Sequence, residues 1–133
     1  MTNELEEPIE IKRSTIFTKD GYCIGFVKAI LYTENGRVLD LEYKISEENF
    51  RGQGYGKKAV KRFINQLRQD GYKNLLNATV EAENIASIKI LEACGFLRLA
   101  SFENTHNYIL HFNQSAEEMR NAINLTNKQL NNL

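Results

Sequence analysis

The sequence predicts an α/β (α+β) fold in which helices flank a mixed, mostly antiparallel sheet of about six strands. Apolar and polar side chains alternate along residues 38–45, which is typical of a strand with one buried face. Over residues 56–70, apolar side chains recur every three or four positions, which predicts a helix. Gly52 and Gly54 lie between the two segments, and Gly56 is the first residue of the second. A strand, a glycine-rich turn and a helix in this order favour phosphate binding, since the backbone can approach an anion at the start of the helix.

Three strands are expected before the glycine-rich turn. Residues 1–8 are predicted to be a flexible lead, and the first strand is expected over residues 9–18. Lys19-Asp20-Gly21 is a turn signal that leads into a second strand over residues 22–32. An Asn-Gly pair at 35–36 is typical of the hairpin turn that would join it to the third strand. Because successive strands are joined by short turns, we expect all three to pair antiparallel.

The second half of the chain is expected to add a parallel strand to this sheet. The helix should stop at Gly71, and a strand over residues 73–80 then requires a right-handed crossover to lie parallel to the third strand. A second helix is expected to begin at Asn84 or Ile85 and to end at Gly95. The last two strands are predicted over residues 96–101 and 106–112.

Residues 113–133 are predicted to form a polar C-terminal helix or tail. Ser115 and Glu118 have the spacing of a capping box, with Ser115 as the N-cap. A thin apolar stripe follows on an asparagine-rich helix, and its members are Met119, Ile123 and Leu130. The stripe is compatible with a frayed surface helix, with packing against the domain, or with contacts in a homodimer.

The composition indicates one domain and excludes several classes of function. The 133 residues suffice for one core, and the balance of 17 basic and 17 acidic side chains does not favour a nucleic-acid partner. No apolar run has the length of a membrane span, and the acidic residues 1–7 are unlike a signal peptide. Cys23 and Cys94 are widely separated in apolar segments, so we expect reduced core thiols in a cytoplasmic protein and no metal site.

The spacing of residues in the glycine-rich turn separates three kinds of phosphate loop. A P-loop requires Ser or Thr after Gly56-Lys57, where this chain has Lys58. A Rossmann loop requires a third glycine where this chain has Lys57. A pattern of Arg51-x-x-Gly54-x-Gly56 remains, which is either a ligand loop of another kind or a tight turn without a ligand.

This remaining pattern resembles the acetyl-CoA pyrophosphate loop of the GNAT superfamily of N-acetyltransferases. A second GNAT-like motif follows at the expected distance, with Asn84-x-x-Ser87 at the start of a helix and Glu92-x-x-Gly95-Phe96 at its end. The resemblance extends over residues 15–112 and is greatest to the branch of ribosomal-protein and polyamine acetyltransferases. It implies a GNAT-like acyl-CoA-binding domain at residues 9–112, in which a central pair of parallel strands splays apart.

The resemblance implies acetyl-CoA as the co-substrate and no metal. It places the cofactor along the end of the third strand, the glycine-rich loop and the start of the second helix. Asn84 would bond the pantetheine arm, although an N-cap role explains the same residue. Lys89 would approach the adenosine 3′-phosphate, or simply be solvated. The implied cofactor-binding residues are Ile45, Ser46, Arg51, Gly52, Gln53, Gly54, Tyr55, Gly56, Lys57, Asn84, Ser87 and Lys89.

On this resemblance a primary amine, of a small molecule or a protein N-terminus, attacks the thioester directly. A backbone N–H near Ile45 or Ser46 would stabilise the oxyanion. Glu42 is the candidate catalytic base, because alternation places it on the strand face opposite Leu41, close to the loop. Glu81 is a second candidate, and either carboxylate is also compatible with a solvated strand position.

The sequence departs from the family pattern at two places. Leu91 stands where many members have the tyrosine that protonates the leaving thiolate, so Tyr108 or a water would have to replace it. The usual N-terminal helices are largely missing, since few residues precede the first strand. The acceptor side is therefore expected to be open, or completed by the tail helix or another subunit. These departures leave two alternatives to an enzyme, which are an inactive acyl-CoA-binding module and a subunit that lends its sheet to a partner.

Overall fold

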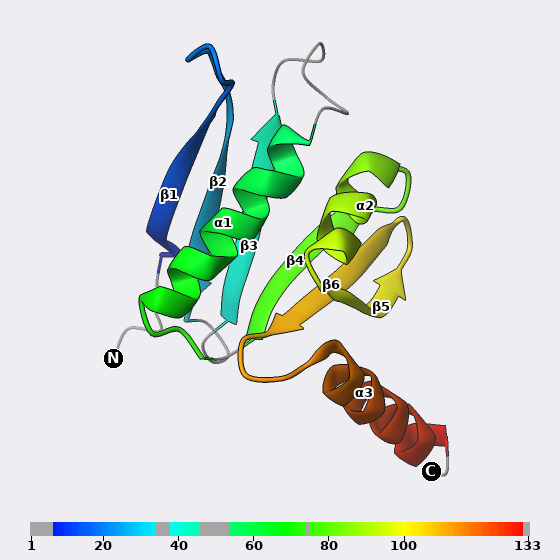
Figure 1. Ribbon diagram of the computed structural model, residues 1–133. Coiled ribbons are helices and arrows are strands. Elements are labelled where there is room, and N and C mark those ends of the chain that lie inside the picture. The colour runs from blue at the N-terminus through cyan, green and yellow to red at the C-terminus, as the bar shows by residue number, and fades with distance from the viewer. Residues whose placement is uncertain (1–6, 34–37, 46–53, 74, 132–133) are drawn as a thin grey trace.

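The structure is a computed structural model that describes residues 7–33, 38–45, 54–73 and 75–131. The described part contains six strands and three helices (Figure 1). In chain order these are β1 (Ile9–Phe17), β2 (Cys23–Tyr32), β3 (Val38–Ile45), α1 (Tyr55–Gln69), β4 (Leu75–Glu81), α2 (Ile85–Ala93), β5 (Leu97–Phe102), β6 (Thr105–His111) and α3 (Ala116–Asn131).

One six-stranded sheet connects all the strands in the order β1-β2-β3-β4-β6-β5. The first three strands pair antiparallel, and β4 lies parallel to β3, as the sequence predicts. Thr18 and Gly21 close the turn between β1 and β2, where Gly21 has a φ of 90°. No helix lies between these two strands. The sheet is mixed and mostly antiparallel, and its parallel pair, β3 and β4, lies at the centre, which confirms the predicted fold class.

The parallel pair β3 and β4 is joined over only two positions. Leu39 is in register with Leu76, and Asp40 with Asn77, and no pairing joins the strands beyond these positions in the described residues. At the last paired position Asn77 Nδ2 donates a hydrogen bond to Asp40 Oδ1 at 2.9 Å, and Asn107 from β6 donates to Asn77 Oδ1. Side chains of three strands therefore tie the sheet together where β3 and β4 start to diverge.

Helices α1 and α2 lie on the same face of the sheet (Figure 1). The apolar stripe of α1 is fully buried, as the periodicity of the sequence predicts; its residues are Val60, Phe63, Ile64 and Leu67. From α2, Ile88 and Leu91 enter the same core, which also receives Leu41 from β3 and Leu76 from β4. Burial of these side chains fixes α1 and α2 on either side of the gap between β3 and β4.

The predicted helix ends are confirmed by their capping geometry. Gly71 and Gly95 have φ values of 96° and 95°, which suits the position just after a helix. In α3 the backbone N–H of Glu118 donates to Ser115 Oγ, and the backbone N–H of Ser115 donates to Glu118 Oε1, which makes a reciprocal capping box.

Only the first part of α3 is packed against the domain. Met119 is buried in the core, and its Sδ accepts a hydrogen bond from the backbone N–H of His111 at 3.2 Å. Leu125 and Leu130, both on the later turns, are 59% exposed. Figure 1 shows that α3 lies beyond the end of the sheet, apart from α1 and α2.

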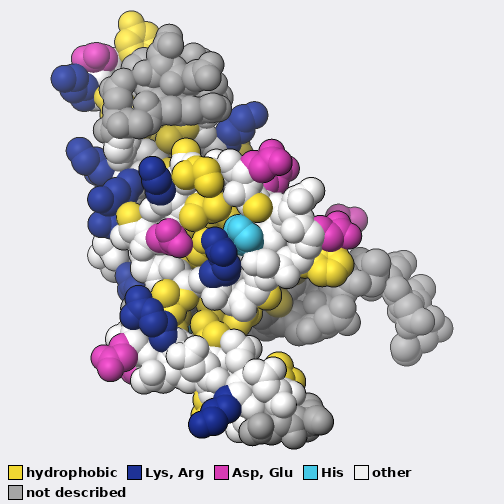
Figure 2. Space-filling view, turned by 90° about the vertical axis from the view of Figure 1, so that its right-hand side faces the viewer, with side chains coloured by type: hydrophobic (Ala, Val, Ile, Leu, Met, Phe, Trp, Pro, Cys, Tyr) yellow, Lys and Arg dark blue, Asp and Glu magenta, His cyan; other side chains and the backbone are white. Residues whose placement is uncertain are grey.

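The edge strand β5 has hydrophobic side chains on the surface. Leu99 and Phe102 are exposed, the latter at 74%. The view from this side of the molecule shows hydrophobic surface between charged groups and one histidine (Figure 2). In the described part of the chain, β5 pairs only with β6, so its other side is open to solvent or to another molecule.

The prediction that both cysteines lie in the core is wrong for Cys23. Both thiols are free, but Cys23 is exposed and Cys94 is half-buried. Cys23 is the first residue of β2 and lies opposite the exposed Phe17, next to an irregularity in the register of β1 and β2. None of the three described helices covers the side chain at this end of the hairpin, so an apolar neighbourhood in the sequence does not produce burial.

Candidate functional site

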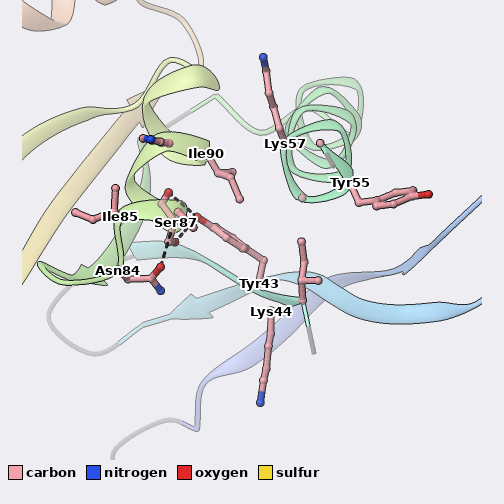
Figure 3. A pocket seen from close by; sticks show the side chains of 13 residues that line it. Tyr43, Lys44, Tyr55, Lys57, Asn84, Ile85, Ser87 and Ile90 are labelled. Carbon is pink, nitrogen blue, oxygen red and sulfur yellow. Dashed lines mark hydrogen bonds between the residues drawn. The ribbon is translucent and has the colours of Figure 1, made fainter. Parts of the chain in front are cut away.

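A cavity of about 680 Å³ opens where β3, α1 and α2 meet. The end of β3 forms its floor, the first turn of α1 one wall, and the first turns of α2 the other (Figure 3). The residues that line it are Tyr43, Lys44, Ile45, Gly54, Tyr55, Gly56, Lys57, Asn84, Ile85, Ala86, Ser87, Lys89 and Ile90. The cavity therefore lies between the two elements that the core holds apart.

The N-terminal ends of both helices face this cavity. Gly54 is the N-cap of α1 in the left-handed conformation, with a φ of 83°, and apart from its chain neighbours no atom of the described residues lies within 4 Å of the point where its Cβ would stand. Asn84 is the N-cap of α2, where its Oδ1 accepts a hydrogen bond from the backbone N–H of Ser87 at 3.1 Å. Free N–H groups in the first turn of a helix favour an anion. The cavity can therefore hold a phosphorylated ligand.

Gly56 allows the first turn of α1 to approach both walls of the cavity. A Cβ on this residue would lie 2.7 Å from Ile45 Cδ1 and 2.9 Å from Ile90 Cδ1. Gly56 is buried, and the two isoleucines come from β3 and α2. The glycine thus brings the backbone of α1 into contact with apolar side chains from two other elements.

The positive charges at the cavity lie at its rim. Lys57 and Lys89 are exposed, and Lys44 points to the other side of β3, so that it lines the cavity with its main chain (Figure 3). The floor of the cavity therefore has apolar side chains and uncharged hydrogen-bonding groups. The lysine side chains can reach a charged ligand from the rim.

A second, smaller cavity of about 280 Å³ lies in the gap between β3 and β4. Glu42 and Glu81 line it from the two diverging strands, and Leu91 lines it from α2. Three residues line both cavities, namely Tyr43, Asn84 and Ser87. The two cavities are therefore neighbours that meet at these three side chains.

Tyr43 and Ser87 form a bridge across the boundary of the two cavities. The hydroxyl group of Tyr43 donates to the carbonyl oxygen of Ser87 at 3.1 Å and lies 2.5 Å from Ser87 Oγ. Burial raises the pKa of Tyr43 to about 12, although the hydrogen bond from Ser87 acts in the opposite direction. Tyr43 therefore carries a neutral hydroxyl group over the whole range from pH 6 to pH 10.

The structure brings most of the predicted site residues to these two cavities. Eight of the predicted cofactor-binding residues line the larger one: Ile45, Gly54, Tyr55, Gly56, Lys57, Asn84, Ser87 and Lys89. Ser46, Arg51, Gly52 and Gln53 lie outside the described residues. The candidate bases Glu42 and Glu81 are exposed and line the smaller cavity. Leu91 also lines the smaller cavity, so a side chain without a polar atom stands where many family members have the tyrosine that protonates the thiolate.

Tyr108 does not reach either cavity. Its side chain is completely buried, and its hydroxyl group accepts hydrogen bonds from Arg98, at 3.1 Å from Nη2, and donates one to Glu92. Tyr108 is therefore not a substitute for the missing tyrosine, and Tyr43 is a residue of the site that the sequence motifs did not indicate. Alternation along β3 does point Tyr43 inward, but the alternation alone does not show that the inward face borders a cavity at this end.

Gly25 is a second residue whose importance the sequence did not reveal. A Cβ on Gly25 would lie 1.9 Å from the carbonyl oxygen of Lys44, so β2 can pair closely with the end of β3 only because this residue is glycine. A glycine inside an apolar strand is the signal that indicates such a close approach.

Two kinds of feature were not found in the described part of the chain. No group of three or more His, Cys, Asp or Glu side chains is placed to hold a metal ion. Among the helices described, none has the length and apolar character needed to cross a membrane.

Comparison with known proteins identifies one family. The family profile described as "Acetyltransferase (GNAT) domain" matches residues 6–97. No curated protein sequence matches the chain.

Solved structures share the fold at low sequence identity. A domain from Methanocaldococcus jannaschii is 26% identical, with a TM-score of 0.57 over 68% of this chain and 57% of that one. The structure of yncA from Salmonella typhimurium with its cofactor acetyl-CoA is 18% identical, with a TM-score of 0.57 over 73% and 62%. Mutant forms of the spermidine/spermine N-acetyltransferase SpeG from Vibrio cholerae are 18% identical, with a TM-score of 0.57 over 75% and 66%. The chain thus spans between 57% and 66% of the length of these three proteins.

Proposed function

This chain belongs to the GNAT family of acetyltransferases, and on that premise we propose that it transfers the acetyl group of acetyl-CoA to a primary amine. The acceptor is a small molecule or the N-terminus of a protein. The observation that carries the proposal is the cavity between α1 and α2, which two helix N-termini face and which opens into the gap between β3 and β4.

The residues around the larger cavity suit the parts of acetyl-CoA. The N-terminus of α1 suits the pyrophosphate, since no side chain among the described residues fills the space beside Gly54. Asn84 and the main chain at Ile45 offer hydrogen-bonding groups to the amides of the pantetheine arm, and Lys89 lies at the rim for the 3′-phosphate. We include Ser46, Arg51, Gly52 and Gln53 in this site on the loop motif alone.

The smaller cavity suits the acceptor amine. The amine nitrogen forms a bond to the acetyl carbon, the carbon–sulfur bond breaks, and the sulfur leaves with the electron pair. We assign Glu42 as the base that receives the proton of the amine, because Glu42 lies in the gap and on the face away from the helices. A main-chain N–H at the end of β3 would stabilise the negative charge on the carbonyl oxygen.

The need for a base depends on the acceptor. A lysine-like amine with a pKa near 10.4 loses about 4–5 kcal/mol in giving up its proton at pH 7, whereas an α-amine near pKa 8 loses about 1–1.5 kcal/mol. An exposed glutamate such as Glu42 suits the second kind of acceptor without further help. The two free cysteines, Cys23 and Cys94, fit a cytoplasmic location, which we include in the proposal.

Two observations favour a second function, an acyl-CoA-binding module without turnover. Leu91 lies in the gap at the position of the expected acid, and α1 and α2 cover only one face of the sheet, so the described residues provide few walls on the acceptor side. A second copy of the chain could supply these walls in a homodimer.

The two functions are separated by measuring binding and turnover on the same protein. Acetyl-CoA should raise the midpoint of thermal unfolding, and isothermal titration should give a binding constant. Release of free thiol is then followed with a panel of polyamines, amino sugars and peptides with free N-termini, and acetylated products are identified by mass. Binding with product supports the enzyme, and binding without any product supports the module. Absence of binding would contradict both.

A further inference from the structure

Two hydroxyl groups lie at the place where the two cavities meet. Among the described residues, Tyr43 and Ser87 are the ones that line both cavities and carry a hydroxyl group. They come from elements on opposite sides of the gap, since Tyr43 is on β3 and Ser87 is in the first turn of α2. On the proposed function, a thioester held by the larger cavity must meet an amine in the smaller one at this boundary.

The hydrogen bonds of the pair leave one proton for a third partner. Ser87 Oγ–H can donate to the oxygen of Tyr43 over the 2.5 Å between them, and this bond fixes the position of that oxygen. The O–H of Tyr43 then points to the carbonyl oxygen of Ser87 at 3.1 Å. A rotation about the C–O bond of Tyr43 redirects this proton into the boundary without moving the ring. A hydrogen bond received from Ser87 also strengthens Tyr43 as a donor.

Other hydroxyl and thiol groups are worse placed for this role. Tyr108 is bonded to Arg98 and Glu92 inside the core, and Leu91 has no polar atom. Thr79 lines the smaller cavity only, and Cys94 lines neither cavity. Tyr43 is therefore the donor that the geometry favours.

We propose that Tyr43 is a catalytic residue that donates a hydrogen bond to the sulfur atom of CoA as it departs, and that Ser87 is its positioning residue. This inference rests on the proposed function. When the carbon–sulfur bond breaks, the sulfur takes the electron pair and becomes a thiolate, which accepts the O–H of Tyr43. The proton of the amine goes to Glu42 or to water, and the thiolate takes its final proton from solvent after it leaves the boundary.

The first test compares two substitutions that each remove one hydrogen-bonded phenol hydroxyl group, at the half-buried Tyr43 and at the buried Tyr108. Tyr43→Phe should lower kcat about 10- to 100-fold, the range expected for a hydrogen bond to a charged group, with little change in KM for acetyl-CoA. The control Tyr108→Phe, whose hydroxyl group faces Arg98 and Glu92, should keep kcat within about twofold of the original. Ser87→Ala should give a smaller loss than Tyr43→Phe, because the donor remains but its oxygen is no longer held. Thermal unfolding checks that each variant is folded.

The second test measures binding and needs no acceptor. The affinities of CoA and of desulfo-CoA, which lacks the sulfur, are compared at pH 7 and at pH 10. The thiol of CoA, with a pKa near 8.5, is ionised at the higher pH, whereas Tyr43 keeps its proton. The preference for CoA over desulfo-CoA should therefore increase with pH about tenfold or more further in the original protein than in Tyr43→Phe. Charged groups around the boundary, which are Lys57, Lys89, Glu42 and Glu81, also act on the thiolate, but they are the same in both proteins and therefore cancel when Tyr43→Phe is compared with the original protein.

The outcomes distinguish this inference from the proposed function. If both ligands bind and the preference changes with pH equally in Tyr43→Phe and in the original protein, the role of Tyr43 is wrong while acyl-CoA binding stands. An unchanged kcat in Tyr43→Phe would contradict it as well. If the original protein binds neither ligand, the proposed function fails and this inference fails with it.

Discussion

The carbonyl oxygen of Lys44 lies 1.9 Å from the point where a Cβ atom on Gly25 would stand. Gly25 is in register with Ile45, so this contact joins the beginning of β2 to the end of β3. Because the obstacle is main chain, it cannot rotate away as a side chain would. The last residues of β3 line the larger cavity, and their position therefore depends on a glycine in β2.

Gly25→Ala should reduce both stability and ligand affinity. A methyl group at this position forces the ends of β2 and β3 apart, and such overpacking costs about 1–3 kcal/mol of the free energy of unfolding. The displaced main chain at Ile45 should also weaken binding of CoA about tenfold or more. Denaturant unfolding and isothermal titration measure the two effects.

Gly21→Ala is the control for this substitution. Gly21 lies in the turn between β1 and β2 with a φ of 90° and no atom within 4 Å of its Cβ position, so the change costs about 1–2 kcal/mol through the backbone alone. It should leave CoA affinity unchanged. Equal affinity in Gly25→Ala and the original protein would mean that the end of β3 does not hold the ligand.

Gly54→Val should abolish measurable CoA binding. Gly54 has a φ of 83°, a conformation that a β-branched residue adopts at a high cost, and the side chain would extend into the larger cavity where the pyrophosphate is proposed to lie. Gly71→Val is a matched control at the opposite end of the same helix, with a φ of 96° and equally open surroundings. Both variants should lose similar stability, and only Gly54→Val should lose affinity. A similar loss of affinity in both would attribute the effect to destabilisation of α1.

The sequence predicted the elements well where local signals decide them. The alternation of apolar and polar residues predicted the observed bounds of β3. The helical periodicity predicted α1 within one residue at each end, because Gly54 and Gly71 mark the two ends of this helix. Gly71 and Gly95 end their helices, and Ser115 begins α3, because each of these roles depends only on residues within one helical turn.

The contacts that shape the site depend on residues far apart in the chain. The bond between Tyr43 and Ser87 joins residues separated by 44 positions, and neither local periodicity nor a motif indicates which partner an inward-facing tyrosine meets. The same is true of Gly25, whose requirement comes from the carbonyl group of a neighbouring strand. Cys23 was misplaced for the converse reason, since burial depends on which helix covers a strand end.

Substitutions of Asn84 should separate its role as a cap from its role toward a ligand. Its Oδ1 accepts the hydrogen bond from the backbone N–H of Ser87, so Asn84→Ala should cost about 1 kcal/mol of stability and weaken CoA binding. Asn84→Asp keeps the acceptor and the cap but removes the amide donor. We expect this variant to retain stability and still bind CoA more weakly. If it binds as tightly as the original protein, Asn84 is only a cap.

Glu42→Gln should lower turnover and leave CoA affinity unchanged. Glu42 and Glu81 both line the smaller cavity, but Glu42 comes from the strand that also carries Tyr43. Removal of a general base costs about 10²–10⁴-fold in rate when the acceptor is lysine-like, and less for an α-amine that is partly deprotonated at pH 7. Glu81→Gln, tested in parallel with the same acceptors, should have the smaller effect. The reverse order would reassign the base to Glu81.

Ionisation of Tyr43 should occur at an unusually high pH. Burial raises its pKa to about 12 from an ordinary value of 10.0, so the folded protein holds this proton more tightly than the unfolded chain. The corresponding stability is fully present below about pH 10 and is lost as the pH rises toward 12. Tyr32, whose pKa is also raised by burial and by the charges of Glu42 and Asp40, adds to the same trend in both the original protein and Tyr43→Phe.

Denaturant unfolding between pH 9 and 11.5 should therefore show a steeper loss of stability in the original protein than in Tyr43→Phe. NMR of tyrosine Cζ should show one signal in the original protein that titrates near 12 and is absent from the variant. Identical slopes for the two proteins would show that the hydroxyl group of Tyr43 is in contact with water and not held in the bridge to Ser87.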